Sequence, residues 1–579
     1  MIMTDLHARK IVCIIYWILI IFGIITARLF YLQILLAPAL QQKSHHNYVR
    51  IELTPSRRGN ILDRYGILLA TNTPGTDLYW KVQNATSLTT AHLTTLHMLS
   101  SILDTPFTDE YMLQKIQTAM LTGAPFALAH DVSFEQLSKI AEQCGTCPCI
   151  NFQNHFKRFY PFSTYACHVI GYLGNITVDP AGKMGLEELC EQTLKGTKGT
   201  LIKKINSHGT AVTEIELSPA ATGTTLVTTL DMQIQTIAEN TFPLSLTGTC
   251  IIMNPIDGAI LALLSRPSFD PSIFLKPIAS TTWSTLQEGS PFINRAVNPY
   301  PPGSIFKLVT MSAALEHNII DAEKQIYCRG YYTFAHRRYW CNKRLGHGHL
   351  STTHAIGKSC NIVFFDIGKQ IDIDLLAHYA SLFGLGQKSG FMFPEHTGLV
   401  PSRSWKQTAK GERWWPGETL SAAIGQSFLL VTPVQVARMI GAIFTGYLVN
   451  PRILLNEPVV VQKLLIKDET LAFLKKSMKA VIKKGTAKRL KALSHDLEIY
   501  AKTSTAQIVS LSKGSIDRAH QEHGWFVAHF QYKQESPLVL VMLVEHAGTS
   551  QVATSIAKDF LIEYKKYVDE KILNMAKVM

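Results

Sequence analysis

Pro301-Pro302-Gly303-Ser304-Ile305-Phe306-Lys307 (PPGSIFK) is the stretch that decides how the larger part of this 579-residue chain is read. It leads into an apolar helical pattern, so Ser304 stands at a helix N-terminus with Lys307 one turn later on the same face. Serine becomes a good nucleophile only when a neighbouring base takes its proton, and lysine is such a base only when its pKa is lowered. Ser-x-x-Lys alone also fits an ordinary helix start with a surface lysine.

Two later motifs strengthen the catalytic interpretation. Ser359-Cys360-Asn361 follows a helical segment at a distance compatible with a loop, and it offers a hydroxyl and an amide to relay a proton and hold a substrate amide. Lys502-Thr503-Ser504-Thr505 lies in a strand-like stretch and adds a second cation, hydroxyls and an edge for an extended peptide. Each motif is weak evidence by itself, and their order along the chain is the stronger signal.

The order of elements around these motifs predicts an α/β (α+β) multidomain protein. An antiparallel sheet is expected, whose terminal strands enclose a helical insert. The strands are expected at 222–230, 249–254, 259–265, 498–508, 524–530 and 537–545. The helices are expected at Met232–Glu239 with Asp231 as N-cap, in much of 306–385, and at Ile556–Leu573 as an amphipathic closing helix.

The N-terminal part predicts a membrane anchor followed by an elongated region. Ile11 to Ala27 carries no charge, and the apolar stretch Leu29 to Leu36 extends it to a bilayer span. Positive residues before the run place the N-terminus in the cytoplasm and the remaining chain outside it; a signal peptide cleaved near Ala37-Pro38-Ala39 is the alternative. The expected domains are a cytoplasmic tail 1–10, an anchor 11–35, a mixed pedestal 45–217 and a catalytic domain 222–567.

The composition indicates which partners the protein can have and in what state its cysteines are expected. Lys and Arg number 56 against 43 Asp and Glu, a balance of +13 that favours anionic partners. The basic stretches are short, scattered and without a stacking platform, so nucleic-acid binding is not expected. Ten cysteines are more than expected for reduced thiols in an oxidising compartment, so some should be paired or metal-bound. For Cys144, Cys147 and Cys149 a disulfide is favoured, because no histidine stands near them in sequence.

Four residues have the spacing of a closed zinc site. They form a Cys-x12-Cys-x5-His-x12-Cys pattern and are Cys328, Cys341, His347 and Cys360. Three thiolates and one imidazole suit tetrahedral Zn²⁺. Disulfides or buried free thiols are the alternatives, and His349 or His336 could replace His347 as the ligand.

The three catalytic motifs in this order are the signature of penicillin-binding proteins and class A β-lactamases. Over nearly its whole length the sequence resembles a class B penicillin-binding protein, and within that family the penicillin-binding protein 2 group of the rod-elongation machinery. The further similar positions are Arg58-Gly59, 63–66, Arg158, Tyr160-Pro161, 168–171, 185–187, 294–296, Gly425-Gln426, 430–433, His523 and Trp525-Phe526.

This resemblance implies a peptidoglycan D,D-transpeptidase or carboxypeptidase inhibited by β-lactams. Ser304 would be acylated by a D-alanyl-D-alanine stem peptide and Lys307 would be the base. Ser359, Asn361 and Lys502 would assist proton transfer and binding, Thr503 would contact substrate, and the backbone amides of Ser304 and Thr505 would form the oxyanion hole. The family also implies a cytoplasmic membrane location, a catalytic domain in the periplasm, and a SEDS-type glycosyltransferase partner.

The resemblance also strengthens the zinc hypothesis. In an extended stretch Cys360 would point away from its neighbours Ser359 and Asn361, so a structural zinc would hold the catalytic loop from behind.

One position departs from the family. Ser504 stands where glycine is usual, and a side chain there would crowd the ligand if it pointed into the cleft. Two other functions therefore stay open: a β-lactamase or membrane β-lactam sensor, and a non-catalytic scaffold that activates a membrane glycosyltransferase.

Overall fold

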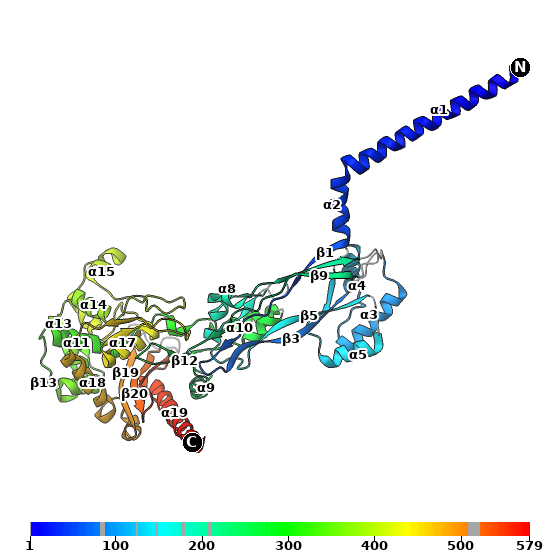
Figure 1. Cartoon of the computed structure of the whole chain (residues 1–579). Helices are drawn as coiled ribbons and strands as arrows, with labels where there is room; N and C mark the ends of the chain where they lie inside the picture. The colour runs from blue at the N-terminus through cyan, green and yellow to red at the C-terminus, as the bar shows by residue number, and fades with distance from the viewer. Residues whose placement is uncertain are drawn as a thin grey trace. The chain divides into compact units, whose positions relative to one another are not determined.

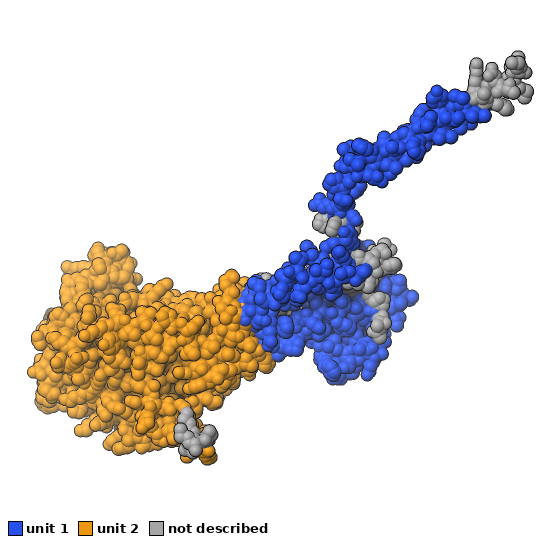
Figure 2. Space-filling model, viewed as in Figure 1, with its two compact units in different colours: residues 1–58, 72–157, 195–223 blue, residues 59–71, 158–194, 224–579 orange. Residues whose placement is uncertain are grey.

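A computed structural model describes residues 2–80, 87–122, 125–144, 147, 149–174, 180–205, 211–276, 278–507 and 521–578. The chain forms two compact units, coloured separately in Figure 2. Unit 1 comprises residues 1–58, 72–157 and 195–223, and unit 2 comprises 59–71, 158–194 and 224–579. The division therefore differs from a contiguous pedestal at 45–217, because two of that region's segments belong to unit 2.

Unit 1 begins with a long apolar helix. Helix α1 (Ile2–Phe30) continues into a π-helical turn η1 (Tyr31–Leu35) and then α2 (Ala37–Tyr48). Lys10–Leu35 is long and apolar enough to cross a membrane, and its apolar window has no buried residues. At about 1.5 Å per residue its 26 residues exceed the roughly 30 Å hydrocarbon core. The segment is thus consistent with a single-pass anchor.

The remainder of unit 1 is a mixture of strands and helices. Strands β1 (Val49–Thr54), β8 (Gly199–Ile205) and β9 (Ala211–Ser218) form an antiparallel sheet. Strand β3 (Leu68–Trp80) pairs with β4 (Phe126–Ala129) and β5 (Ile150–Phe159). The helices are α3 (Thr90–Leu103), α4 (Glu110–Thr122) and α5 (Phe134–Cys144). Their apolar faces share a core that includes Trp80, Leu96 and Ile116.

The cysteine group of unit 1 is only partly described, since residues 145, 146 and 148 lie outside the described residues. The Sγ atoms of Cys147 and Cys149 lie 2.6 Å apart, whereas Cys144 Sγ is 3.9 Å from Met98 Sδ. A disulfide in this group stays a prediction.

Several positions that resemble the family's pedestal meet in unit 2 around one buried ion pair. Arg158 Nε donates to Glu187 Oε1 at 2.7 Å, and its Nη1 donates to the Gly59 carbonyl at 2.7 Å. The two charged side chains are 1% and 0% exposed. Removing one partner of such a pair costs about 3–5 kcal/mol, because the other charge stays buried alone. The elements here are β2 (Ile61–Leu62), α6 (Cys167–Ile170), β6 (Leu173–Gly174), β7 (Ala181–Gly182), α7 (Gly185–Leu189), α8 (Glu191–Leu194) and β10 (Leu226–Val227).

A five-stranded antiparallel sheet organises the rest of unit 2. Its order is β12-β11-β21-β20-β19, so the last three strands of the chain pair with an early hairpin (Figure 1). The strands are β11 (Gly248–Met253), β12 (Ile260–Arg266), β19 (Leu497–Ala506), β20 (His523–Tyr532) and β21 (Leu538–Val544). This confirms the predicted sheet and the helical insert between its hairpin and its terminal strands.

Alternating side chains of this sheet enter two separate cores. Ile251 and Val541 pack with the inserted helices, whereas their neighbours Ile252 and Met542 pack with helices α9 (Met232–Thr241) and α19 (Ser550–Val578). Because strand side chains alternate and both faces are covered, the middle strand β21 is apolar throughout. Asp231 caps α9 as predicted, accepting from the amides of Gln233 and Ile234.

The insert holds most of the remaining helices. They are α10 (Ser280–Gln287), η3 (Arg295–Val297), η4 (Gly303–Ile305), α11 (Lys307–Glu316), α12 (Thr352–Gly357), α13 (Asn361–Gln370), α14 (Ile373–Leu382), α15 (Arg403–Lys410), α16 (Pro416–Ala423), α17 (Pro433–Thr445) and α18 (Asp468–Lys484). The small strands β17 (Tyr447–Val449) and β18 (Val461–Lys463) pair with each other.

Three boundaries were predicted wrongly or cannot be compared. The strand expected at 222–230 is reduced to the two residues of β10. The helical stretch expected at 306–385 is interrupted by β13 (Gln325–Cys328), β14 (Tyr331–Phe334), β15 (Arg337–Trp340) and β16 (Gly348–Ser351), which form two small hairpin-like sheets. Ile508, the predicted end of the β19 strand, lies outside the described residues.

Candidate active site

The turn that carries Ser304 is fixed by its neighbours. Ser304 lies in the 3-10 turn η4, and Lys307 is the first residue of α11. Gly303 has φ +51°, and a Cβ at Gly425 would lie 1.9 Å from the Gly303 carbonyl oxygen. Trp525 Nε1 also donates to the Pro301 carbonyl at 3.1 Å. The close approach of Gly425 requires glycine, and together these contacts hold the nucleophile turn in one conformation.

Two buried lysines converge on one hydroxyl. Lys307 Nζ donates to Ser359 Oγ at 3.3 Å and Lys502 Nζ donates to the same oxygen at 3.1 Å. Lys307 Nζ also donates to the Ser359 carbonyl at 2.9 Å. Both lysine side chains are fully buried. The structure thus brings together three residues that are distant in sequence.

Burial changes the proton affinity of both amines. It lowers the pKa of Lys307 from its usual 10.5 to about 8, because the charged form loses its hydration. The pKa of Lys502 falls well below its usual value, first through burial and then through the neighbouring Lys307 charge. An amine with a pKa near 8 can accept a proton at neutral pH.

Asn361 connects this cluster to a neighbouring hairpin. Its Oδ1 accepts from Lys307 Nζ at 2.7 Å, and its Nδ2 donates to the Trp340 carbonyl at 3.0 Å. Cys360 itself is extended, with φ −62° and ψ 129°, but its neighbours are not: Ser359 has φ +53° and Asn361 is the first residue of α13. The left-handed residue and the helix start nevertheless send Cys360 into a different environment from its two neighbours.

Three other predicted site residues, Ser304, Thr503 and Thr505, have side chains that make no hydrogen bond to the two lysines among the residues that the structure describes. Ser304 is partly exposed, and within the described part of the chain its hydroxyl makes no hydrogen bond, including none to Lys307. The Thr503 side chain is buried and lies 2.5 Å from Thr486 Oγ1, whereas Thr505 Oγ1 accepts from the Ser550 amide at the start of α19. The side chains of both threonines therefore have structural contacts, and because Thr505 Oγ1 acts there as an acceptor, its O–H can still donate to a ligand.

Ser504 turns its hydroxyl towards the nucleophile turn. Ser504 Oγ donates to the Pro302 carbonyl at 2.8 Å, and the residue is 2% exposed. A Cβ at Gly303 would lie 2.4 Å from the same oxygen. The side chain that departs from the family pattern therefore fills the space beneath the turn.

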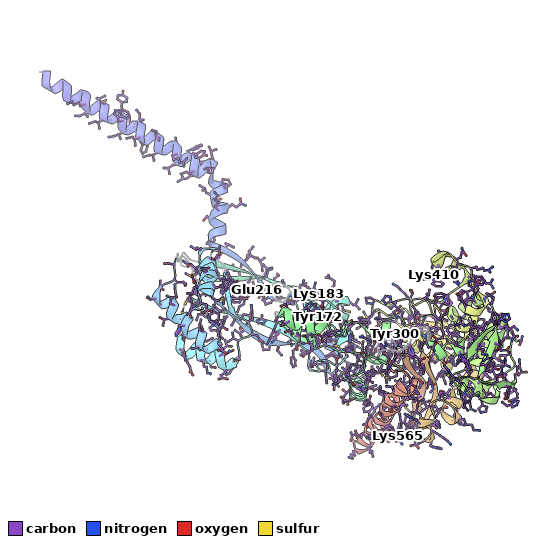
Figure 3. All side chains as sticks on the ribbon, turned by 180° about the vertical axis from the view of Figure 1, so that it is seen from behind. Tyr172, Lys183, Glu216, Tyr300, Lys410 and Lys565 are labelled. Carbon is purple, nitrogen blue, oxygen red and sulfur yellow. The ribbon has the colours of Figure 1, made fainter. Side chains whose placement is uncertain are left out.

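Sequence reasoning missed a polar network behind the same turn. Glu545 Oε1 accepts from Tyr300 Oη at 2.6 Å and from Arg295 Nε at 2.9 Å. Tyr300, labelled in Figure 3, lies just before the nucleophile turn, and Glu545 directly follows β21. A carboxylate directly after the seven fully buried residues of β21 was the available signal.

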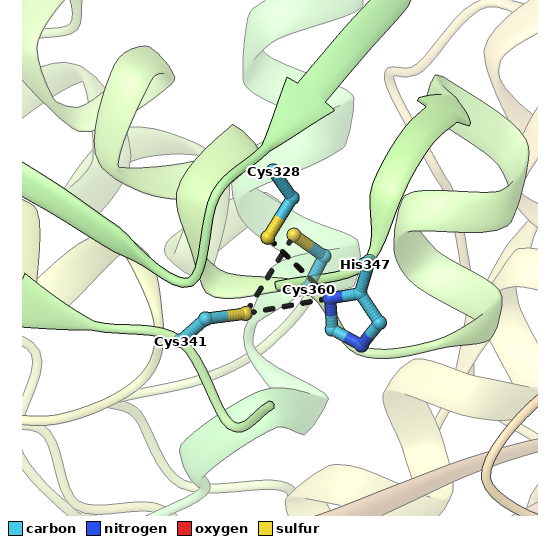
Figure 4. A group of neighbouring side chains, drawn as sticks. All are labelled: Cys328, Cys341, His347 and Cys360. Atoms are coloured by element: carbon cyan, nitrogen blue, oxygen red, sulfur yellow. Dashed lines mark hydrogen bonds between the residues drawn. The ribbon is translucent and has the colours of Figure 1, made fainter. Parts of the chain in front are cut away.

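The four predicted zinc ligands point towards one another (Figure 4). Their ligand atoms all lie within 4.8 Å, and the three cysteines are buried. Cys341 Sγ is 3.5 Å from His347 Nδ1 and 3.8 Å from Cys360 Sγ, and Cys328 Sγ is 3.6 Å from the same ring nitrogen. Zinc bonds of about 2.0–2.3 Å in a tetrahedron place neighbouring donors about 3.5–3.8 Å apart, so this donor set fits the ion.

Comparison with known families identifies the class of protein that this fold and site define. Residues 248–561 match the penicillin-binding protein transpeptidase domain, and residues 53–228 match the penicillin-binding protein dimerisation domain. The chain belongs to the penicillin-binding protein transpeptidase family, and it is a serine-type D,D-transpeptidase.

Individual relatives narrow the position within the family. The chain is 27% identical to peptidoglycan D,D-transpeptidase MrdA of Haemophilus influenzae, over 97% of this chain and 92% of the relative. It is 29% identical to MrdA of Acinetobacter baumannii, over 94% of this chain and 86% of the relative. The resemblance to the penicillin-binding protein 2 group is thereby confirmed.

Solved structures agree in fold. Penicillin-binding protein 2 of Helicobacter pylori in its complex with MreC has a TM-score of 0.77 at 24% identity, covering 90% of this chain and 99% of that one. A protein from a study of polymerisation and crosslinking by a peptidoglycan synthase complex has a TM-score of 0.73 at 26% identity, covering 96% and 98%.

Replacing Ser504 should reveal what its hydroxyl contributes. We expect Ser504→Ala to lower the free energy of unfolding by about 1–3 kcal/mol, because the buried Pro302 carbonyl loses its donor. Ser504→Gly should cost about 0.5–1 kcal/mol more through backbone freedom. Ser312→Ala is the matched control, because that buried hydroxyl donates to the Leu308 carbonyl of its own helix. Denaturant unfolding measures all three, and equal stability of Ser504→Ala and wild type would contradict the assignment.

Proposed function

We propose that this transpeptidase crosslinks peptidoglycan stem peptides through an acyl-enzyme on Ser304. Ser304 Oγ bonds to the carbonyl carbon of the penultimate D-alanine while its proton passes to Lys307 Nζ. The bond to the terminal D-alanine then breaks, and its nitrogen leaves with a proton. An amine of a neighbouring stem attacks the ester, and its lost proton restores the Ser304 hydroxyl. β-Lactams acylate the same oxygen.

One observation carries this proposal: the buried Lys307 amine, three residues after Ser304, bonds to both Ser359 and Asn361. Its lowered pKa suits a base at neutral pH. Lys502, which lies on strand β19, donates to the Ser359 hydroxyl and supplies a second route for the proton. The edge strand β19 offers backbone groups to an extended stem peptide, and the amides of Ser304 and Thr505 would hold the oxyanion.

The other functions have less support. The match to the transpeptidase domain together with the dimerisation domain does not favour a β-lactamase or a β-lactam sensor. A non-catalytic scaffold was suggested only by Ser504, and the buried position of that side chain removes the reason for it.

The nucleophile can be located directly. We expect benzylpenicillin to add its mass to the tryptic peptide that contains Ser304, and Ser304→Ala to take up no label, because Ser304 is partly exposed at the helix start whereas the Ser359 hydroxyl beside Lys307 is buried. Ser312→Ala, in the same helix region, should label as wild type does. Peptide mass spectrometry distinguishes these outcomes, and covalent label on Ser304→Ala protein would refute the assignment.

The pH dependence of acylation tests the role of Lys307. The neutral amine is the active form, so the acylation rate should rise with pH up to a plateau with a midpoint near 8. Below the midpoint the rate should fall about tenfold per pH unit, because each unit removes nine-tenths of the neutral amine. Stopped-flow acylation by a fluorescent penicillin between pH 6 and 9.5 gives the profile. A flat profile would show that Lys307 is not the base.

We further propose that Cys328, Cys341, His347 and Cys360 hold a structural zinc. The donor set is closed, with four protein ligands and no position left for substrate. Cys360 joins it to the catalytic residues on either side, so the ion would fix the orientation of Ser359 and Asn361. When bound, the metal supplies a rigid cross-link and no reaction step.

Metal removal tests this role. Chelated protein and Cys341→Ser should lose zinc, and acylation by a fluorescent penicillin should slow about 10–100-fold, because the catalytic loop loses its support. Cys190→Ser, outside the cluster, serves as the control for a lost thiol. Elemental analysis and labelling are measured on the same sample. Full labelling of demonstrably metal-free protein would show that the ion has no part in orienting the loop.

The setting of the reaction is also a proposal. The apolar span Lys10–Leu35 with positive residues before it supports a single-pass anchor in the cytoplasmic membrane, with the catalytic domain in the periplasm. A SEDS-type glycosyltransferase is the proposed partner. It is supported by the likeness to a protein from a complex that couples polymerisation and crosslinking.

A further inference from the structure

The segment from residue 325 to residue 365 contains no Asp or Glu. It carries six positive side chains, which are Arg329, Arg337, Arg338, Lys343, Arg344 and Lys358. None of them forms an ion pair within the described parts of the chain, and the four arginines are exposed. Uncompensated charges of one sign repel one another, so such a surface has a functional explanation more readily than a structural one.

Arg337 and Arg338 lie on the β14–β15 hairpin, and Arg329, Lys343 and Arg344 lie within four residues of its ends. The two faces of the hairpin differ. Tyr332 and Tyr339 are cross-strand partners and pack against the core beside Phe365. Tyr331 and Trp340 are the next pair, on the opposite face, and the Trp340 side chain remains 44% exposed. The outward face therefore presents aromatic rings to solvent.

Three arginines are held against these outward rings. The guanidinium carbons of Arg329 and Arg338 lie 4.5 and 5.0 Å from the Tyr331 ring centroid, and that of Arg344 lies 5.4 Å from the Trp340 ring. Tyr331 and Trp340 are themselves 5.8 Å apart. Cation–π contact of this kind holds the guanidinium groups at the rings, and apart from the Arg329 Nε bond to the Tyr331 carbonyl no hydrogen bond uses their donors within the described residues. We call Arg329, Tyr331, Arg338, Trp340 and Arg344 the cationic hairpin.

The cationic hairpin is attached to the catalytic cluster. The Trp340 carbonyl accepts from Asn361 Nδ2 at 3.0 Å, and Asn361 Oδ1 accepts from Lys307 Nζ. A substrate segment adjoining the reactive peptide is therefore within reach of this face.

We propose that the cationic hairpin binds the carboxylate-bearing peptide and glycan of an uncrosslinked peptidoglycan strand, next to the site of acylation. Pre-oriented guanidinium groups pair with planar carboxylates through two parallel hydrogen bonds, and an exposed tryptophan face packs against sugar rings. This choice of ligand rests on the proposed function. An anionic lipid surface is the competing occupant, but charge attraction to headgroups needs no stacked arginines.

Binding measurements on full-length protein in detergent test the proposal. All proteins carry Ser304→Ala, so no chemistry occurs and the outcome is independent of which residue is the nucleophile. The probe is a soluble, fluorescent, uncrosslinked strand with pentapeptide stems, followed by anisotropy. The test variant combines Arg329→Gln, Arg338→Gln and Arg344→Gln. The control combines Arg337→Gln, on the opposite face of the same hairpin, with Lys369→Gln and Lys388→Gln, so it removes the same charge outside the cationic hairpin. Thermal unfolding verifies the fold of both variants.

We expect the test variant to bind the strand at least tenfold more weakly than the parent, and the control to stay within twofold. Strands whose stem carboxylates have been amidated should bind the parent with a similar loss, which probes the contact without altering the protein. Unchanged affinity in the test variant, or equal binding of amidated strands, would overturn the proposal. So would a test variant that loses binding to phosphatidylglycerol vesicles but keeps its affinity for the strand.

Discussion

The site depends on a single constraint: two lysines with fully buried side chains share one serine hydroxyl. Taking each charged amine out of water costs several kcal/mol, and repulsion between the two charges adds to that cost. The pair relieves this cost by releasing protons, and each pKa unit corresponds to about 1.36 kcal/mol. Burial thus prepares Lys307 as a base, and the Lys307 charge adds to burial in lowering the pKa of Lys502.

Holding that arrangement requires a rigid surround. The nucleophile turn is enclosed by Gly425 on one side and by Ser504 on another, and both contacts involve Gly303. Behind it, Glu545 ties Tyr300 to Arg295. The α12–α13 junction, which carries Ser359 in a left-handed conformation, is supported on its far side by the cysteine cluster. Strain at Ser359 persists because its neighbours determine its position.

Much of this could be predicted from sequence, because the decisive residues are either apolar strands or reactive side chains at short spacings. The five strands of the main sheet and the Asp231 cap follow from local pattern alone. The meeting of Ser359 with Lys502 does not, since 143 residues separate them and only the family pattern connects the motifs. The role of Ser504 was also hidden, because sequence shows that a side chain is present but not where it points.

The two-residue β10 and the hairpins within 325–351 are elements that the sequence pattern did not predict. Thr222–Leu230 is rich in strand-forming residues, yet only Leu226 and Val227 form a strand, with a single bridge from Thr228 to Leu454, because the partner β2 has only two residues. The hairpins are too short and too polar on one face to give a periodic signal. Their position depends on contacts that the sequence does not reveal: Asn361 Nδ2 donates to the Trp340 carbonyl, and the Cys341 amide donates to the Gly330 carbonyl.

Strand β19 occupies the outer end of the sheet, with β20 as its sheet partner in the described structure. A peptide added there would continue the ladder as a sixth strand. Side chains of such a strand alternate with a period of two, so a slip by one residue would reverse every side chain. Because alternate residues of an added strand face the same side, pairing at this edge fixes which alternate peptide bonds of the substrate can be presented to Ser304.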